Sequence, residues 1–370
     1  MIRSATALAA LAEALAEAEV LGLDAEGDGF FRYRTRLCTL QLADGERAHV
    51  IDTLAIEDLS PLAPLLGPEG PLKVVHDVSF DRKMLASRGL PLAPVFDTAA
   101  AARMLGEPST GLAALLEARF EVVLDKRHQR ADWGARPLTD DQLAYLAADV
   151  VHLPALAREL REAALALDVL EEIDEETRYA MERALEPEPV REPGSRIKGA
   201  MDLTPPARAL LFALAEAREE VAREQDVPPF RVAPNAALLE AAKRRPRRAE
   251  DLRRIRGLHR MPSDALRAAL AEAERRAAAP PEPPPPAPDP AVRRVLRARE
   301  SALTSWRAAE AAARGVDVQV VLPGHCLRDL SALAVVDAAS VAAVPGLGDK
   351  RVARYGERLL ALLCDGSSRG

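Results

Sequence analysis

Two carboxylates close together in the sequence are the first candidates for catalytic or metal-binding residues. Asp24 and Glu26 end a short apolar run that begins at Val20 and predicts a buried strand. The side chains of a strand alternate between its faces, so both carboxylates point to the same side. Such like charges repel strongly when buried, and either their pKa values rise or divalent cations neutralise them. The pair therefore indicates a cation site, and an exposed strand with alternating acids is the alternative.

A third acid follows the next apolar strand, which we expect over residues 72–76. Asp81 lies near the start of a helix expected over residues 79–88, on the same helical face as Met84, which should face the sheet. A carboxylate at this junction of a strand end and a helix start can point inward. Asp77, at the strand end itself, is the alternative ligand, and we prefer Asp81.

Tyr145 and Asp149 complete the candidate set. They lie four residues apart in a helix expected over residues 140–160, and this spacing places the phenol and the carboxylate on one helical face. A half-buried tyrosine beside a surface acid is the alternative interpretation. Because hard cations such as Mg²⁺ and Mn²⁺ prefer oxygen ligands, the four acids together favour one of these two metals.

These segments resemble the tyrosine-bearing branch of the DEDD superfamily of 3'-to-5' exonucleases, and most closely the ribonuclease D family. The resemblance covers residues 1–165. Its three motifs match residues 24–26, 75–81 and 145–149. Residues 124–138 are similar to the segment that precedes the third motif in this family, and this stretch is the most specific part of the match.

The resemblance implies an α/β domain with the ribonuclease H-like fold, in which helices flank a mixed sheet whose first three strands are antiparallel. The sequence agrees, because residues 36–43 and 47–52 are typical of strands around the hairpin-type turn Asp44-Gly45-Glu46. A helix over residues 57–66 and the strand over residues 72–76 then follow, as in other α/β domains.

The resemblance also implies a two-metal-ion hydrolysis of phosphodiesters. In this mechanism Asp24, Glu26, Asp81 and Asp149 hold two Mg²⁺ or Mn²⁺ ions, with Asp24 bridging both. Tyr145 positions the attacking water. These five residues are the predicted catalytic residues, and the four acids are the predicted metal ligands.

A basic segment with a nearby aromatic residue precedes the third motif. It could bind the phosphates of a single-stranded 3' end and stack on a base. The predicted nucleic-acid contacts are Lys126, Arg127, Gln129, Arg130, Trp133 and Arg136. A solvated charged loop with Trp133 packed in the core is the alternative.

Length and proline-rich breaks divide the chain of 370 residues into several domains. We expect an exonuclease domain over 1–165, a helical extension and linker over 166–203, a first HRDC-like domain over 204–279, a proline-rich linker over 280–290 and a second HRDC-like domain over 291–365. The fold prediction is thus an α/β ribonuclease H-like exonuclease domain followed by two small all-α HRDC-like domains.

The helical domains are assigned by resemblance to the HRDC domain that accompanies ribonuclease D and RecQ helicases. In the first, the expected helices span residues 205–225, 235–243, 249–253 and 262–278. The second repeats this layout more loosely. Its turn Gly346-Leu347-Gly348, before the last helix, could offer backbone N–H groups to a phosphate or could simply connect two helices.

The net charge of -7 conceals an asymmetry. Residues 1–200 hold 22 Lys/Arg and 35 Asp/Glu, whereas residues 201–370 hold 28 and 22. The acidic run 171–176 is interpreted as a solvated helix. Residues 243–260 hold nine Lys/Arg against two acids and favour RNA binding, with a merely solvated basic face as the alternative. The predicted contacts there are Lys243, Arg244, Arg245, Arg247 and Arg248.

Several classes of protein are disfavoured. The sequence has no run of eighteen apolar residues, and its N-terminal helix carries acids instead of the basic region of a signal peptide. Its three cysteines are far apart, which argues against disulfides and zinc sites. We expect a cytoplasmic monomer that has no membrane partner.

The sequence therefore predicts a metal-dependent 3'-to-5' exoribonuclease. By resemblance, it would trim tRNA precursors and small stable RNAs with single-stranded 3' ends, and it would release nucleoside 5'-monophosphates. A 3'-to-5' DNA exonuclease in repair needs the same acids and is the first alternative. A non-catalytic nucleic-acid-binding protein is the second.

Overall fold

The computed structural model describes residues 1–187, 189, 191–279 and 289–368. The chain divides into two compact units. One unit comprises Met1–Glu26, Leu37–Glu186 and Pro286–Gly370, and the other comprises Gly27–Arg36 and Pro187–Pro285. The predicted proline-rich linker over 280–290 lies outside the described residues except for its last two positions.

In the described part of the chain, five strands form one mixed sheet. They are β1 (Val20–Gly27), β2 (Leu37–Ala43), β3 (Ala48–Asp52), β4 (Leu72–Val75) and β5 (Val95–Asp97). Their spatial order is β3-β2-β1-β4-β5. The β2–β3 hairpin is antiparallel, whereas β4 pairs parallel with both β1 and β5. β1, which carries the first acidic motif, therefore lies at the centre of the sheet.

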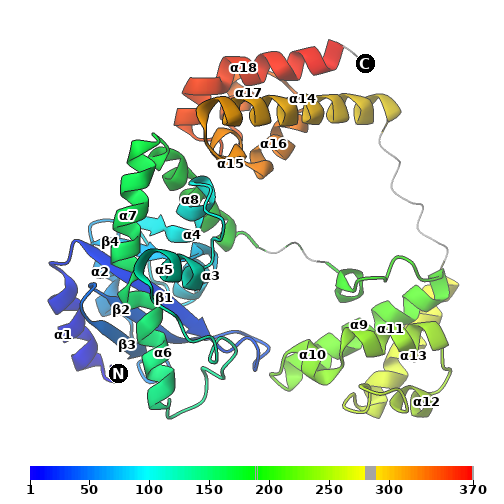
Figure 1. The fold of residues 1–370 in the computed structure, drawn as a ribbon. Helices are drawn as coiled ribbons and strands as arrows, with labels where there is room; N and C mark the ends of the chain where they lie inside the picture. Colours follow the sequence, from blue (N-terminus) through cyan, green and yellow to red (C-terminus); the bar gives the residue numbers. More distant parts are fainter. Residues whose placement is uncertain (188, 190, 280–288, 369–370) are drawn as a thin grey trace. The chain divides into compact units, whose positions relative to one another are not determined.

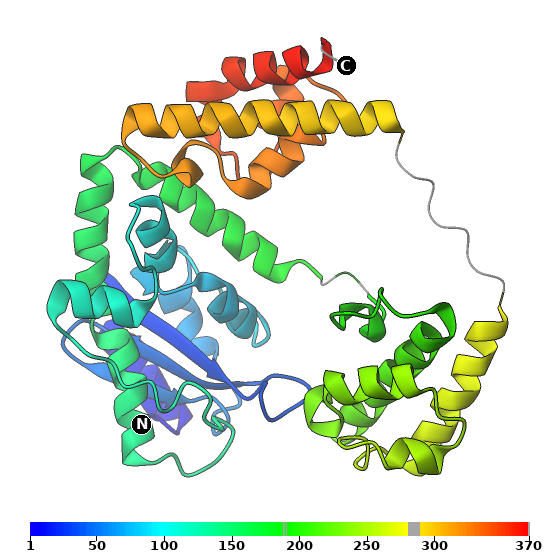
Figure 2. The same ribbon diagram turned by 45° about the vertical axis from the view of Figure 1, so that its right-hand side comes forward.

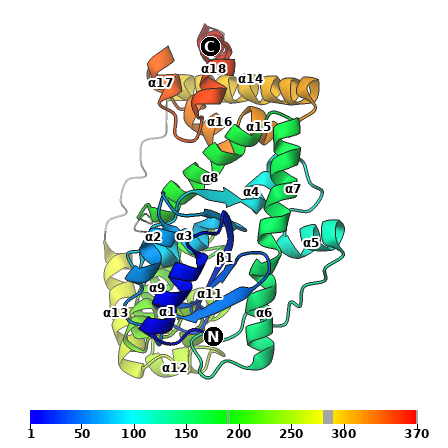
Figure 3. The same ribbon diagram turned by 90° about the vertical axis from the view of Figure 1, so that its left-hand side faces the viewer.

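Helices cover both faces of this sheet (Figure 1). On one side, α1 (Ala5–Leu15) and α3 (Val78–Ala86) share a core with β1 and β2. On the other side lie α4 (Thr98–Met104), α5 (Leu112–Phe120), α6 (Asp140–Val151) and α7 (Leu153–Ala166). Figure 3 shows α1 on one side of β1 and α6 with α7 on the other.

The helix predicted over residues 140–160 is wrong as a single element, because it is two helices. α6 ends at Val151 and α7 begins at Leu153, with His152 between them. Pro154 explains the break, since its ring would clash with the carbonyl of Val150 in a continuous helix and it has no N–H to donate.

The helix predicted over residues 57–66 is also wrong in length. Only a 3-10 turn, Ser60–Leu62, and a short helix α2 (Ala63–Leu66) form there. Pro61 and Pro64 remove two backbone donors, and this prevents a longer hydrogen-bonded helix.

The first helical domain has its own core. It contains α9 (Pro205–Glu224), α10 (Pro229–Val232), α11 (Asn235–Arg244), α12 (Ala249–Arg253) and α13 (Ser263–Ala278). These bounds agree with the predicted helices to within about two residues, and α10 is an additional short turn. The loop Gly27–Arg36 belongs to the same unit. There the Tyr33 hydroxyl donates to Glu219, and the Arg231 guanidinium lies over the Phe31 ring.

The second helical domain is built from α14 (Pro290–Arg314), α15 (Val318–Val321), α16 (Gly324–Ser331), α17 (Ala338–Ala342) and α18 (Asp349–Ser368). Figure 2 shows the long α14 beside α18. Their shared core includes Leu303, Leu327 and Leu359. Among the residues that the structure places, no helix has the length and apolar character needed to cross a membrane.

The second helical domain belongs to the same unit as the sheet and contacts α8 (Leu170–Leu185). Arg351 is almost fully buried and pairs with Glu175 at 3.0 Å, and Lys350 pairs with Glu172 at 3.0 Å. The interpretation of residues 171–176 as a solvated helix is therefore wrong, because Glu172 and Glu175 are buried as partners of basic side chains.

The turn Gly346-Leu347-Gly348 holds one of these carboxylates. Both glycines have positive φ, and a Cβ on Gly348 would lie 1.8 Å from the carboxyl carbon of Glu175. The backbone N–H of Lys350 donates to the same carboxylate at 3.3 Å. The anion at this helix N-terminus is thus a side chain of the protein itself.

Candidate active site

One face of β1 carries the first two acids. Leu21, Leu23 and Ala25 alternate into the core below the sheet, so Gly22, Asp24 and Glu26 point to the other face. On that face, a Cβ on Gly22 would lie only 2.4 Å from the carbonyl oxygen of Val150. A glycine is therefore required where the end of α6 approaches β1.

This close approach brings α6 within reach of the acids on β1. Carboxylate oxygens of Asp24, Glu26 and Asp149 all lie within 4.8 Å of one another. The arrangement suits a divalent cation, because three carboxylate oxygens at this spacing can ligate a hard ion together. Two segments more than a hundred residues apart thus form one candidate metal centre.

Asp81, on α3, lies beside this group, but it is not one of the three acids whose carboxylate oxygens lie within 4.8 Å of one another. It is 3% exposed, and its Oδ1 has no hydrogen-bond partner. Its carboxyl accepts the backbone N–H of Ala25 and is affected by the charge of Asp24. Asp77, the alternative ligand, is exposed and has a left-handed backbone. The structure therefore places Asp81, and not Asp77, beside β1.

The negative charges of the carboxylates in this cluster repel one another. Burial, and then the charge of Asp149, raise the pKa of Asp24 to about 7. Burial and the charges of Asp24 and Asp149 raise the pKa of Glu26 to about 9, and burial raises that of Asp149 to about 6. Burial and Asp24 raise the pKa of Asp81 well above its usual value. A bound divalent cation would reverse this effect by stabilising the ionised carboxylates.

Tyr145 is 9% exposed and hydrogen-bonds to Asp149, one helical turn further along α6. Burial and the charges of Asp149 and Glu26 raise its pKa above the usual phenol value, so the hydroxyl keeps its proton at neutral pH. Its ring stacks on Trp133 with centroids 5.8 Å apart and meets His128 edge-on at the same distance. These aromatic contacts fix the direction of the phenol.

The predicted nucleic-acid contacts of Trp133 and Arg136 are wrong in this structure. Trp133 is only 1% exposed and belongs to the core, as in the alternative interpretation, so it has no face open to a base. Arg136 binds Asp52 through two nitrogens and donates to the carbonyls of Cys38, Trp133 and Ala135. All five N–H groups of its guanidinium are used in this way.

The other predicted contacts of the basic segment are exposed. They are Lys126, Arg127, Gln129 and Arg130. Arg127 forms an ion pair with Asp125, and the Nη2–Oδ2 distance is 2.6 Å. The segment thus remains available to a ligand, and at Arg127 a phosphate would compete with the neighbouring carboxylate.

The basic residues of the first helical domain are also exposed. They are Lys243, Arg244, Arg245, Arg247 and Arg248. Arg244 pairs with Glu240 on its own helix. Arg244, Arg245 and Arg247 line a hollow of about 660 Å³ between the segment that follows α11 and helices α9 and α13. These guanidinium groups lie along one groove of a domain that folds around its own core.

Asp97 is a residue whose role the sequence analysis missed. It caps α4, where its Oδ1 accepts the N–H groups of Ala99 and Ala100. The same carboxylate accepts the N–H of Asp77 at 3.0 Å and of Val78 at 3.1 Å, and these residues begin α3. One buried carboxylate thus ties the start of the helix that carries Asp81 to the neighbouring strand. An Asp before a helix signals the cap of α4, but only the fold reveals the second pair of bonds.

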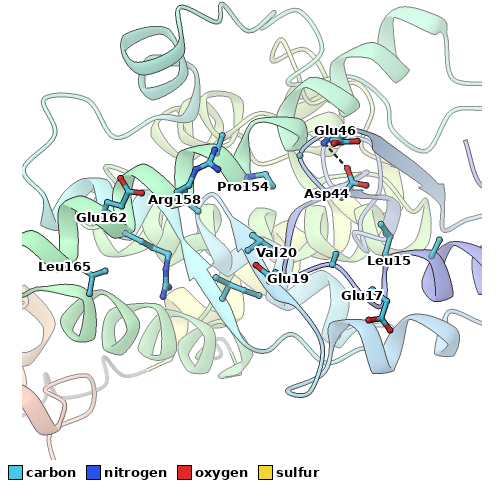
Figure 4. A pocket seen from close by; sticks show the side chains of 17 residues that line it. Leu15, Glu17, Glu19, Val20, Asp44, Glu46, Pro154, Arg158, Glu162 and Leu165 are labelled. Carbon is cyan, nitrogen blue, oxygen red and sulfur yellow. Dashed lines mark hydrogen bonds between the residues drawn. The ribbon is translucent and has the colours of Figure 1, made fainter.

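A cavity of about 1010 Å³ lies at another place in the same unit (Figure 4). It is lined by the end of α1, the β2–β3 turn and α7, and its charged residues include Glu17, Arg158 and Glu162. None of the four candidate metal ligands lines it. Cavity size therefore does not mark the chemical centre of this molecule.

The chain is similar to known protein families and to characterised relatives. Residues 1–164 match a family model described as 3'-5' exonuclease, and residues 207–273 and 297–363 match the HRDC domain. The chain is 37% identical over 232 residues to ribonuclease D of Cronobacter turicensis. It is 35% identical over 272 residues to ribonuclease D of Zymomonas mobilis.

These matches cover most of the chain. The Cronobacter alignment covers 61% of this chain and 62% of the relative, so the chain spans less than two thirds of that protein. The Zymomonas alignment covers 70% and 67%. A crystal structure of Escherichia coli RNase D, described as an exoribonuclease involved in structured RNA processing, is similar over 99% of this chain and 98% of its own. The TM-score is 0.69 at 28% identity, and this likeness confirms the predicted fold class.

The carboxyl cluster predicts an unusual dependence of stability on pH. A carboxyl whose pKa is raised by folding keeps its proton when the unfolded chain has already lost it, so raising the pH favours unfolding. With EDTA present, the thermal unfolding midpoint should decrease as the pH is raised from about 5 to about 9. The decrease should be smaller in Glu26→Gln, because this change removes the group whose pKa is about 9. Mg²⁺ should reduce the fall. The exposed change Glu57→Gln is the control, and an equal slope in all three proteins would contradict the repulsion.

Asp97 should influence metal affinity without touching a metal. Asp97→Ala leaves the first N–H groups of α3 without their acceptor, so Mn²⁺ binding measured by calorimetry should weaken by about 10- to 100-fold. Asp97→Asn keeps one oxygen acceptor and should recover part of the loss. Asp337→Ala removes a comparable cap from α17, where Asp337 accepts the N–H of Ser340. Equal Mn²⁺ affinities in Asp97→Ala and Asp337→Ala would show that Asp97 only caps α4.

Proposed function

The chain belongs to the ribonuclease D family, and from this premise we propose that it is a metal-dependent 3'-to-5' exoribonuclease. The observation that carries the proposal is the convergence of Asp24, Glu26 and Asp149 within 4.8 Å, with Asp81 beside them. This cluster lies in the part of the chain that matches the exonuclease model.

The acids have distinct places in the proposed mechanism. Two divalent ions, Mg²⁺ or Mn²⁺, would supply an activated water and stabilise the leaving 3'-oxygen. The charge of Asp24 interacts with those of Asp149 and Asp81, and these interactions support its proposed role as a metal ligand. Glu26, Asp81 and Asp149 would complete the two coordination shells.

Tyr145 would orient the attacking water. Its hydroxyl is bound to Asp149, and its ring is held by Trp133 and His128. Because its pKa is raised, the phenol is better suited to hold and direct a water molecule than to remove its proton. In-line attack on the last phosphodiester would release nucleoside 5'-monophosphates.

We propose structured RNAs with a single-stranded 3' end as substrates, namely tRNA precursors and small stable RNAs, in the cytoplasm. The exposed groups Lys126, Arg127, Gln129 and Arg130 would bind the phosphates of the 3' tail. The exposed basic groove of the first helical domain would bind the folded part of the RNA. In the second helical domain, Lys350 and Arg351 pair with acids of α8.

The family relationship favours RNA over the DNA alternative, because the named relatives are ribonucleases. Parallel digestion of 5'-labelled RNA and DNA oligomers of one sequence tests the choice. Faster shortening of the RNA is expected, and faster shortening of the DNA would contradict the proposed substrate.

Asp24→Asn should reduce turnover by more than about 100-fold, because losing a ligand should cost more than losing one of its supporting residues. Shortening of a 5'-labelled RNA in Mg²⁺ measures turnover, and thermal melting checks that the protein is folded. Asp77→Asn is the matched control, since Asp77 is a nearby exposed acid. Parental activity in Asp24→Asn would refute the assignment, as would an equal loss in Asp77→Asn.

Arg245→Gln with Arg247→Gln, two exposed residues of the groove, should weaken binding to a tRNA precursor and flatten its salt dependence by about 0.9 in slope for each lost phosphate contact. The binding constant is measured against salt concentration in Asp24→Asn protein, which does not digest the ligand. Arg293→Gln with Arg297→Gln on α14 removes equal exposed charge and should change the slope less. Equal flattening in both pairs would indicate an effect of net charge instead of a binding groove.

A further inference from the structure

A small cavity adjoins the candidate metal centre and has no role in the function proposed so far. It has a volume of about 260 Å³ and lies between residues 122–127 and one face of α6. Tyr145 and Asp149 form part of its wall. A molecule that enters it therefore lies next to the residues assigned to the reaction.

The rest of the wall is aliphatic. Val122, Val123 and Leu124 lie on the loop side, and Ala144 and Ala148 lie on the helix side. Val123 is 79% exposed, an unusual state for a large apolar side chain of this chain. The two alanines on α6 leave space where longer side chains would fill the cavity. These surfaces suit a flat apolar ring.

The polar groups of the wall disfavour a phosphate. Asp125, Asp141 and Asp149 line the cavity together with a single cation, Arg127, so carboxylates outnumber cations in its wall. Carboxylates accept hydrogen bonds and repel anions. The wall therefore suits a neutral ring that donates N–H groups.

We propose that this cavity is a nucleobase subsite, which binds the base of one of the two nucleotides joined by the scissile phosphodiester. Adenine, cytosine and guanine carry an exocyclic amino group that can donate to the carboxylates. Uracil has only the N3–H, which lies between two carbonyl oxygens that carboxylates repel. The subsite therefore prefers these three bases over uracil. The inference rests on the proposed exonuclease function and adds a source of sequence preference to it.

A cycle that combines a protein change with a substrate change tests the subsite. Ala144 is exposed on α6, and Ala144→Leu fills the cavity without burying a new polar group. The substrates are 5'-labelled RNA oligomers with adenine, uracil or no base at the last or the penultimate position. The value of kcat/KM for removal of the last nucleotide is measured for each. Ala166→Leu, an exposed change in α7 outside this cavity, is the matched control.

In the parent, removing the base at one of the two positions should lower kcat/KM by roughly tenfold. Ala144→Leu should cause a similar loss with the adenine substrate and almost none with the baseless substrate, because the same contact is then already absent. The preference for adenine over uracil should also disappear in Ala144→Leu. Ala166→Leu should behave as the parent does.

Two results would overturn the subsite alone. One is an equal loss in Ala144→Leu with every substrate, which would indicate a disturbance of Tyr145 instead of a lost base contact. The other is full independence of the base in the parent at both positions. If the parent releases no mononucleotide from any RNA in Mg²⁺, the proposed function itself fails, and the subsite fails with it.

Discussion

The mutual repulsion of buried carboxylates around Asp24 is the constraint on which the rest of the catalytic unit depends. Burial is the first cause of the raised pKa of each acid in the group, and neighbouring acids add to the effect for Asp24, Glu26 and Asp81. Such a cluster would separate if its segments could move apart. The surrounding structure must therefore hold the acids together until cations neutralise them.

Close backbone packing and buried hydrogen bonds hold the acids in place. Gly22 lets the carbonyl of Val150, at the end of α6, approach β1 closely. The buried Asp97 holds the start of α3, and the N–H of Ala25 is donated to Asp81. Because these contacts are made within the protein, the geometry of the acids is set before any substrate binds.

The two helical domains resemble each other in layout but use their charges differently. In the second, Arg351 is buried against Glu175, and the glycine turn holds that carboxylate, so these groups are engaged within the protein. In the first, Arg247 and Arg248 remain exposed. Tandem copies of one fold thus place their basic groups differently, in internal contacts in one copy and on an exposed surface in the other.

The sequence by itself determined which residue types were available and the class of fold. The alternation of β1 already placed Asp24 and Glu26 on one face, because strand periodicity is a local property. Helical periodicity also favoured Asp81 over Asp77. The sequence could not show whether Trp133 faces solvent, because burial depends on segments distant in the chain. The tertiary structure alone decided that Asp97 supports two helices and that Arg136 is occupied by Asp52. Those contacts join segments brought together only by the folding of the sheet, and no local pattern encodes them.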